Sequence, residues 1–406
     1  MSKSGAGRLL LLSIAVVCLT ALGACAPAGS GVQLAPENLA LQATVQGYHN
    51  IRFYSSDFES GRKLAEDAIQ LVKEAHPGQD LKGRVVQLAY LSISGGGEDG
   101  AFGAGLLNGW SGSGTRPKFD VVTGVSTGSL IAPFAFLGSE YDDVVKQAYT
   151  TTSTADVVDI NFIPAVLGIA AGISSNDLFE KLIARYLTPE IFEAIRREYR
   201  KGRMLLIGTT NLESQQPVIW NIGAIAASGK PDALDLARHI LMASASIPGV
   251  FPPVRLQVTV DGKFYDELHA DGGVTRQVFL LPPGYDPELV DKAIGWKAQR
   301  RAFIIRNGLV RPEYQAVNDS LLPLALRSVS TLIKTQGVGD LYRIYLFCQR
   351  YSIQYNLAYI PNEFEAPPHA MFDEKFMNSL YDLGYQESIR GYPWRKQPPG
   401  LEKNPS

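Results

Sequence analysis

Residues 119–128 read Phe-Asp-Val-Val-Thr-Gly-Val-Ser-Thr-Gly. The apolar run at 119–123 predicts a buried strand, and residues 129–137 predict the helix that follows. Between them lies a Gly-x-Ser-x-Gly pattern, in the strand, turn and helix context that a nucleophilic serine requires. Glycines at its two ends leave room for a sharp turn, and the helix N-terminus favours negative charge near Ser126. Ser126 is therefore predicted as a nucleophile, and a chance loop with two glycines is the alternative.

Strand and helix patterns alternate through most of the chain. Short apolar runs predict further strands at 85–92, 204–209, 218–222, 278–281 and 302–305, and Asp261-Gly262 predicts a hairpin turn within 258–264. Apolar residues at helical spacing predict helices at 62–75, 101–108, 142–149, 177–187, 189–199, 231–245, 321–334, 341–351 and 372–385. This alternation favours an α/β fold with a mainly parallel central sheet, in one catalytic domain over residues 35–395.

A second glycine-rich loop, residues 94–100, reads Ser-Gly-Gly-Gly-Glu-Asp-Gly and also lies between a predicted strand and a predicted helix. Consecutive glycines let backbone N–H groups approach a substrate oxygen closely, which suits an oxyanion hole. A phosphate-binding loop is disfavoured, because neither Gly-Lys-Ser/Thr nor a dinucleotide fingerprint follows. A purely structural turn is the remaining alternative. A third element, Asp271-Gly272-Gly273, is a weak signal by itself because Asp-Gly is a common turn.

Taken together, these motifs resemble those of the patatin-like phospholipases. The order is a glycine-rich loop, then Gly-x-Ser-x-Gly, then Asp-Gly-Gly well downstream. Residues 243–248, Ala-Ser-Ala-Ser-Ile-Pro, and residues 251–253, Phe-Pro-Pro, are similar to a segment that often precedes the family's aspartate. The resemblance covers about residues 85–274 and implies a three-layer α/β/α sandwich.

The family resemblance implies a lipid acyl hydrolase that needs no cofactor. Ser126 would attack an acyl carbonyl, Asp271 would accept its proton, and the N–H groups of Gly95, Gly96 and Gly97 would hold the oxyanion. A membrane lipid ester is the expected substrate. Two alternatives stay open: a carboxylesterase or thioesterase with a soluble substrate, and a catalytically silent lipoprotein that acts as a binding partner.

One departure from the family concerns the residues after the glycines, where many members carry Arg or Lys. Here they are Glu98 and Asp99, so electrostatic help at the oxyanion or at a lipid phosphate should be weaker. Because Asp271 must be ionised to act as a base, its pKa is expected to be ordinary or lowered.

Histidine and metal sites are disfavoured. A Ser-Asp-His chain order would leave only His369, which no motif supports. His269 shares a strand face with Asp271, so it could tune the aspartate, fill space or act directly. No metal-ligand spacing occurs. The apolar neighbours of Cys348 predict a buried thiol.

The N-terminus predicts a lipoprotein signal peptide over residues 1–24. A positively charged start precedes an apolar run at 9–22 that is too short to span a bilayer comfortably. Residues 22–25, Leu-Gly-Ala-Cys, resemble a bacterial lipobox, so Cys25 is expected to carry lipid and residues 25–34 to form a flexible tether. An ordinary secretory signal with an incidental Cys25 is the alternative.

These features predict a lipid-anchored protein of the bacterial cell envelope. The residue after Cys25 is not aspartate, which indicates the outer membrane, facing the periplasm. Charge is nearly balanced, with 38 Lys and Arg against 40 Asp and Glu, so nothing points to nucleic acid. The uncharged apolar segment 162–173 predicts either a buried helix or a mobile cap over an acyl-chain pocket.

Overall fold

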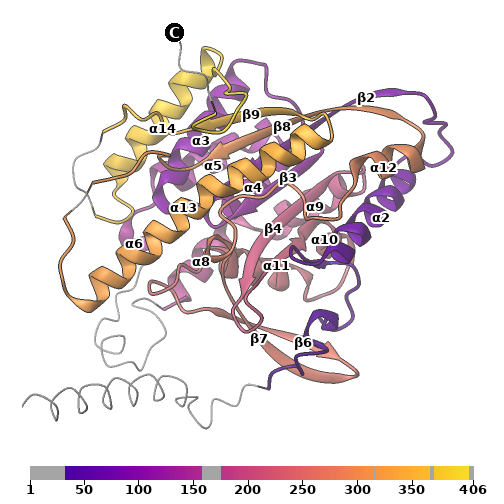
Figure 1. Ribbon diagram of the computed structural model, residues 1–406, viewed down its shortest axis with the longest axis horizontal. Coiled ribbons are helices and arrows are strands. Elements are labelled where there is room, and N and C mark those ends of the chain that lie inside the picture. Colours follow the sequence, from indigo (N-terminus) through magenta and orange to yellow (C-terminus); the bar gives the residue numbers. More distant parts are fainter. Residues whose placement is uncertain (1–32, 158–174, 315, 366–369, 402–406) are drawn as a thin grey trace, which may run out of the picture.

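The computed structural model describes residues 33–157, 175–314, 316–365 and 370–401 (Figure 1). The predicted signal peptide, Cys25, the apolar segment 162–173 and His369 lie outside these ranges. In the described part, no helix is both long and apolar enough to cross a membrane.

A nine-stranded sheet runs through the centre, in the order β1-β5-β4-β3-β2-β8-β9, with β7 attached to β4 and β6 to β7. Its middle is parallel and consists of β4 (Met204–Asn211), β3 (Val121–Val125), β2 (Val85–Ile93), β8 (Lys297–Arg306) and β9 (Gln354–Tyr359). The antiparallel strands lie at one side and are β1 (Arg52–Tyr54), β5 (Gln216–Asn221), β6 (Val254–Val260) and β7 (Lys263–Asp271). The prediction of an α/β fold with a mainly parallel sheet is confirmed.

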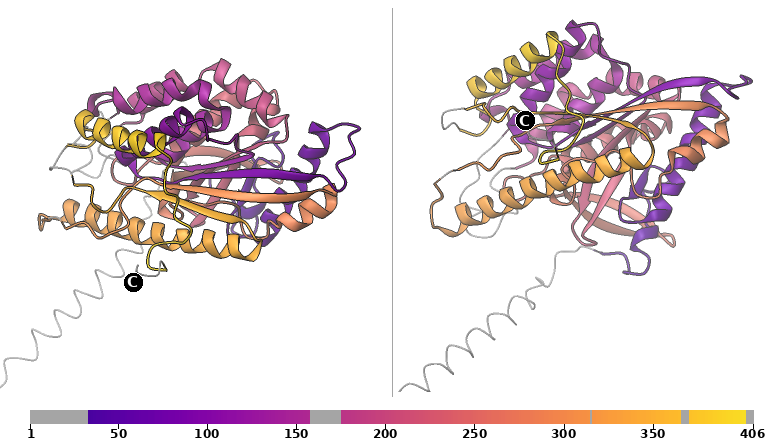
Figure 2. Two further views of the ribbon diagram at one scale, coloured as in Figure 1. Left: turned by 90° about the horizontal axis from the view of Figure 1, so that it is seen from above. Right: turned by 45° about the horizontal axis from the view of Figure 1, so that its top comes forward.

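Helices cover both faces of this sheet, which gives three layers (Figure 2). One face carries α3 (Gly100–Gly112), α4 (Thr127–Leu137), α5 (Asp142–Thr150), α8 (Asp177–Tyr186), α9 (Pro189–Tyr199), α10 (Ile222–Ala227), α11 (Ala233–Ser244) and α14 (Glu374–Ile389). The other carries α2 (Phe58–Ala75), α12 (Pro287–Ile294) and α13 (Leu321–Arg350). Because successive strand residues point to opposite faces, Leu91 packs in the first hydrophobic core and Tyr90 in the second.

The register around β4 explains how distant motifs meet. Strand β3 pairs with β4 up to Val125 opposite Gly208, and β7 pairs with β4 from Asp271 opposite Thr209. Since β5 occupies the other side of β4, strands β3 and β7 lie end to end along one side. The residue after β3 and the last residue of β7 therefore come together.

Several sequence predictions hold in detail. Helix α9 begins at Pro189, and the Thr188 hydroxyl accepts the N–H of Ile191 at 3.4 Å, as its capping signal predicts. Asp261 and Gly262 both have positive φ, 51° and 73°, in the turn between β6 and β7. Cys348 is fully buried. Strands β1 and β9 and helix α12 were not predicted.

The predicted strand at 278–281 is wrong. The segment is buried, as its apolar residues require, but it joins no strand. Side chains satisfy its backbone instead. The Asp340 carboxylate accepts the N–H groups of Gln277 (2.8 Å) and Val278 (3.5 Å), and the Thr123 hydroxyl donates to the carbonyl of Phe279 (2.5 Å).

The two helices predicted at 321–334 and 341–351 are one continuous helix, α13. Gly337 lies in the gap between the two predicted helices, and its lack of a side chain allows close packing. A side-chain carbon there would lie 3.2 Å from Cβ of Gln277 and 3.3 Å from Nη2 of Arg306. The glycine thus lets α13 pass directly over the residues that support the site described next.

Candidate active site

Ser126 stands in a strained turn between β3 and α4. Its φ and ψ are 53° and −128°, which a non-glycine residue adopts only when its surroundings enforce it. A side-chain carbon at Gly124 would lie 2.4 Å from the Gly128 carbonyl oxygen, so the tight turn requires glycine there. The N–H of Ser126 donates to the Ser244 hydroxyl at 3.1 Å. The predicted turn is present, and it is held from α11.

Asp271 ends β7 and faces Ser126. The Ser126 hydroxyl is close enough to this carboxyl to lower its pKa, and the N–H of Gly273 donates to the carboxylate at 2.7 Å. The N–H of Asp271 itself donates to the carbonyl of Ser246 at 3.0 Å. Residues 244–246 thus hold the backbone at both positions.

The expectation of an ordinary or lowered pKa for Asp271 is wrong. Burial raises the pKa of this carboxyl to about 7, and the nearby Ser126 hydroxyl and Gly273 N–H offset only part of the rise. An ionised carboxylate loses its hydration when it is buried, so its neutral form is favoured. The sequence does not show this, because burial depends on the elements packed around the strand end.

The three loop glycines are not equivalent. The N–H of Gly95 donates to the carbonyl of Gln277 at 3.0 Å, so that amide is already occupied. The amides of Gly96 and Gly97 have no hydrogen-bond partner in the described part of the chain. Gly97 borders the same pocket as Ser126. The structure therefore leaves two of the three predicted donors open to a substrate oxygen.

An apolar pocket begins at Ser126. It extends between α4, α5, α8 and α11. Among the described residues its walls are almost entirely apolar and include Leu130, Phe134, Val145, Ala148, Phe179, Leu182, Ile183, Leu241 and Phe251. Such a pocket suits a hydrocarbon chain.

The two acidic residues directly after the glycines are Glu98 and Asp99. The Glu98 carboxylate accepts the N–H of Phe372, which lines the pocket, so the loop is tied to the segment before α14. Burial, reinforced by the carboxylates of Glu313 and Glu98, raises the pKa of Asp99 to about 7.

A cation does reach this loop, but from outside the motif. Arg306, the last residue of β8, donates from Nη1 to the Gly95 carbonyl at 3.0 Å. Nothing in the pattern around Arg306 marked it in advance, because its contact with the loop exists only through the pairing of β8 with β2.

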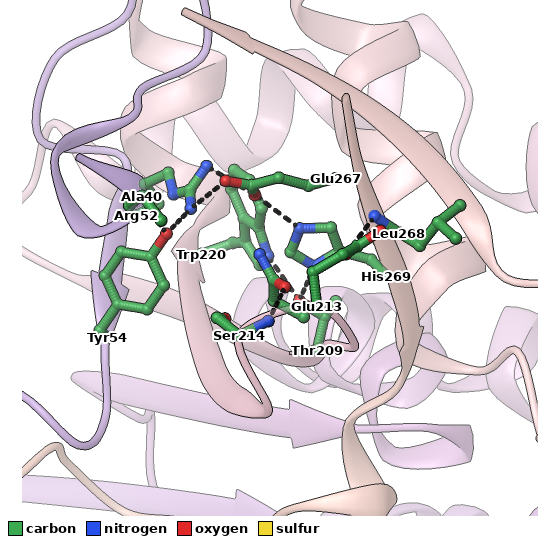
Figure 3. A network of polar contacts seen from close by, with 11 residues as sticks. Ala40, Arg52, Tyr54, Thr209, Glu213, Ser214, Trp220, Glu267, Leu268 and His269 are labelled. Atoms are coloured by element: carbon green, nitrogen blue, oxygen red, sulfur yellow. Dashed lines mark hydrogen bonds and ion pairs between the residues drawn. The ribbon is translucent and has the colours of Figure 1, made fainter. Parts of the chain in front are cut away.

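His269 is buried in a polar network, and both of its ring nitrogens have partners other than Ser126 (Figure 3). Its Nε2 lies 3.1 Å from Glu267, and its Nδ1 lies 2.9 Å from Thr209. The indole N–H of Trp220 donates to the Thr209 hydroxyl, which can then donate to Nδ1 and leaves the His269 proton on Nε2.

Arg52 closes this network at its far end. Its guanidinium lies 3.0 Å from Glu267 and holds the pKa of that carboxyl below its usual value despite burial. Burial lowers the pKa of His269, which favours the neutral ring. Asp271 on β7 pairs with Thr209 on β4, so one residue of this network lies directly opposite the aspartate in the sheet.

A comparison of the sequence with protein-family models finds one match. Residues 91–282 match the family model of the patatin-like phospholipases, and this span contains the glycine loop, Ser126 and Asp271. The chain carries a patatin-like phospholipase domain. This patatin-like domain begins within β2 and ends before α12, so Arg306, α13 and α14 lie beyond it.

Among solved structures, the chain is similar to VipD from Legionella pneumophila, with a TM-score of 0.31 and 12% sequence identity. The match covers 77% of this chain and 66% of VipD. No curated protein matches the sequence. The patatin-like domain indicates a lipid acyl hydrolase. In the described residues, no group of three or more His, Cys, Asp or Glu side chains is arranged to hold a metal ion.

Proposed function

We propose that this protein cleaves carboxylic esters of membrane lipids, with Ser126 as nucleophile and Asp271 as its base. The observation that carries the proposal is the closeness of the Ser126 hydroxyl to the Asp271 carboxyl, beside an apolar pocket that Ser126 lines. A hydroxyl and a carboxylate in contact can transfer a proton, and the pocket can hold the acyl chain of the ester that is attacked.

The proposed reaction has two halves. Ser126 Oγ attacks the acyl carbonyl while Asp271 takes its proton, and the open amides of Gly96 and Gly97 receive the oxyanion. Collapse of the tetrahedral intermediate breaks the ester bond, and the proton on Asp271 passes to the leaving alcohol. Water then attacks the acyl-enzyme by the same route, which releases the fatty acid and restores Ser126.

The decisive experiment measures fatty-acid release from defined phospholipids by wild type, Ser126→Ala and Asp271→Asn. Each variant is expected to lose about 10³-fold or more in kcat. Two matched controls, Ser139→Ala on the exposed turn after α4 and Asp266→Asn on the same strand as Asp271, are expected to stay within about twofold. Near-normal turnover in both site variants would refute the mechanism.

Two further measurements separate the alternative functions. An alkyl fluorophosphonate should label wild type and not Ser126→Ala, and a wild type that is not labelled indicates a silent binding protein. Hydrolysis that improves with acyl-chain length supports a lipid substrate, whereas a preference for short soluble esters or thioesters indicates the other enzyme class.

The proposed location is the bacterial outer membrane, facing the periplasm, with a lipid on Cys25 as the anchor. Two or more acyl chains on one cysteine give durable attachment next to the substrate. Mass spectrometry of the purified N-terminus tests this. A processed chain that begins at an acylated Cys25 supports the proposal, and an unmodified Cys25 overturns it.

A further inference from the structure

Arg306 is a buried cation beneath the glycine loop that the reaction proposed above does not use. The residue is 5% exposed. Nη1 lies within hydrogen-bond distance of four oxygens: 3.0 Å from Gly95 O, 3.1 Å from Asn307 O, 3.2 Å from Ser94 Oγ and 3.3 Å from Gln277 Oε1. Two of these oxygens belong to the loop and one to the residue whose carbonyl accepts the Gly95 N–H.

We propose that Arg306 is a positioning residue that fixes the peptide between Gly95 and Gly96 so that the Gly96 N–H serves the oxyanion. The proposal rests on the function proposed above. In a trans peptide the carbonyl and the N–H point in opposite directions. Arg306 and the Ser94 hydroxyl, at 2.7 Å, both donate to the Gly95 carbonyl. The Gly96 N–H is therefore turned away from them.

The loop lies close enough to Ser126 for that orientation to matter. A side-chain carbon at Gly95 would lie 3.0 Å from Cβ of Ser126. The amide of Gly96 has no partner in the described residues, so it remains free to donate to a substrate. A donor that is already aimed needs no reorganisation when charge develops, which is why such donors contribute strongly to rate.

The residue after Arg306, Asn307, holds the end of β8 in place through three hydrogen bonds. Asn307 donates from its backbone N–H to Ser94 Oγ (2.8 Å) and from Nδ2 to the Ser94 carbonyl (2.9 Å), and it accepts the N–H of Gly103 (3.1 Å). The end of β8 is thereby tied to the end of β2 and to the first turn of α3. Arg306 and Asn307 thus both hydrogen-bond to the first residues of the glycine loop.

A purely structural role does not account for the charge. Nε of Arg306 is buried without a hydrogen-bond partner in the described residues, which is costly for a guanidinium. Arginine stays protonated in proteins, so a full positive charge is retained near the site of oxyanion formation. Burial lowers the pKa of Arg306, and the carboxylates of Asp99, Asp340 and Glu313 oppose that shift. Arg306 thus supplies the cation that the loop sequence lacks.

The test compares Arg306→Lys and Arg306→Gln with wild type, using kcat per active site titrated with a fluorophosphonate. Arg306→Gln is expected to lower kcat about 10²-fold with KM within about threefold, because the aimed donor acts in the transition state. Arg306→Lys keeps the positive charge but replaces the planar guanidinium, with its several N–H donors, by a single ammonium group. We therefore expect an intermediate loss in kcat, of about threefold to tenfold.

Arg300→Gln is the matched control. Arg300 is also buried on β8, but it lies nearer the other end of the strand and pairs with Asp291. It should lower the melting temperature without changing kcat per titrated site. The proposal is overturned if either Arg306 variant keeps the wild-type kcat, or if Arg300→Gln loses as much kcat as Arg306→Gln. Where Arg306→Gln does not fold, Arg306→Lys decides.

Failure of the two proposals is distinguishable. If Ser126→Ala still hydrolyses lipid, the proposed function itself is wrong. If Ser126→Ala is inactive while Arg306→Gln is fully active, only the role of Arg306 is wrong.

Discussion

The backbone N–H of Ser126 donates to the hydroxyl of Ser244, and that hydroxyl donates in turn to the carbonyl of Gly208 at 2.7 Å. One side chain from α11 thus ties the strained turn to β4. Two residues later, the carbonyl of Ser246 accepts the N–H of Asp271. The segment that precedes the family's aspartate in sequence is the brace that sets the serine and the aspartate at a fixed separation.

Removing the Ser244 hydroxyl should therefore impair hydrolysis without touching either side chain of the pair. Ser244→Ala leaves the Ser126 N–H and the Gly208 carbonyl without their buried partner, at a cost of about 1–3 kcal/mol in unfolding free energy. We expect kcat to fall about tenfold or more, because the strained turn relaxes. Ser246→Ala is the control: within the described residues its hydroxyl bonds to the Met242 carbonyl alone, and the carbonyl that holds Asp271 remains. Equal kcat in the two variants would contradict this account.

Hydrolysis should rise with pH through about 7. Asp271 acts as a base only when ionised, and burial raises its pKa to about 7. We expect kcat/KM to fall about tenfold per pH unit well below 7 and to level off above about 8. Since the pKa of Asp99 is also about 7, the profile must be repeated in Asp99→Asn, which should keep the same midpoint. A flat profile from pH 5 to 8 in both proteins would exclude Asp271 as the titrating base.

The same buried carboxyl should destabilise the folded protein at neutral and higher pH. Its folded-state pKa lies above the unfolded value of 3.8, so its stabilising contribution is complete below about pH 4 and is lost as the pH rises to about 7. Asp271→Asn does not titrate and should therefore melt at a higher temperature than wild type at pH 8. The gain should shrink towards pH 5. Calorimetry at both values, with Asp266→Asn as control, measures the difference; a gain independent of pH would contradict the assignment.

Chain-length preference should change when the apolar pocket is shortened. Ala148 lines the pocket from α5, and a large ring there takes up space that an acyl chain needs. Ala148→Trp should reduce the hydrolysis of long-chain esters about tenfold or more relative to short ones. Gln147→Trp places the same ring on the exposed side of that helix and should leave the ratio unchanged. The ratio of kcat/KM values for long and short esters decides, and an unaltered ratio in Ala148→Trp would show that acyl chains bind elsewhere.

His269 should matter for stability and not for the nucleophile. His269→Phe removes one buried hydrogen-bond partner from each of Glu267 and Thr209, so we expect a loss of about 1–3 kcal/mol in unfolding free energy. Protein that still folds should be labelled at Ser126 at a near-normal rate. His269→Gln keeps one donor and one acceptor and should recover part of the stability. Loss of labelling in well-folded His269→Phe would indicate a direct role that these contacts do not support.

Much of the local structure followed from the sequence because local chemistry specifies it. Gly-Val-Ser-Thr-Gly between an apolar run and a helical pattern predicted the turn at Ser126, and Thr188-Pro189 predicted the start of α9. The glycine loop and Asp271 were chosen from their residue types and order. Predictions failed where a distant partner decides the outcome: residues 278–281 take their hydrogen bonds from Asp340 and Thr123, and Gly337 packs against Gln277 where a helix break was expected.

By itself, the sequence determined the fold class, the order of the motifs and the identity of the groups that can react. Only the tertiary structure decided that β3 and β7 meet end to end on β4, that the Gly95 amide is occupied, and that Arg306 lies under the glycine loop. It also decided the pKa of Asp271. The physical reason is the same in each case: residue type fixes which bonds a group can form, whereas strand pairing and burial fix which partners and how much water it meets.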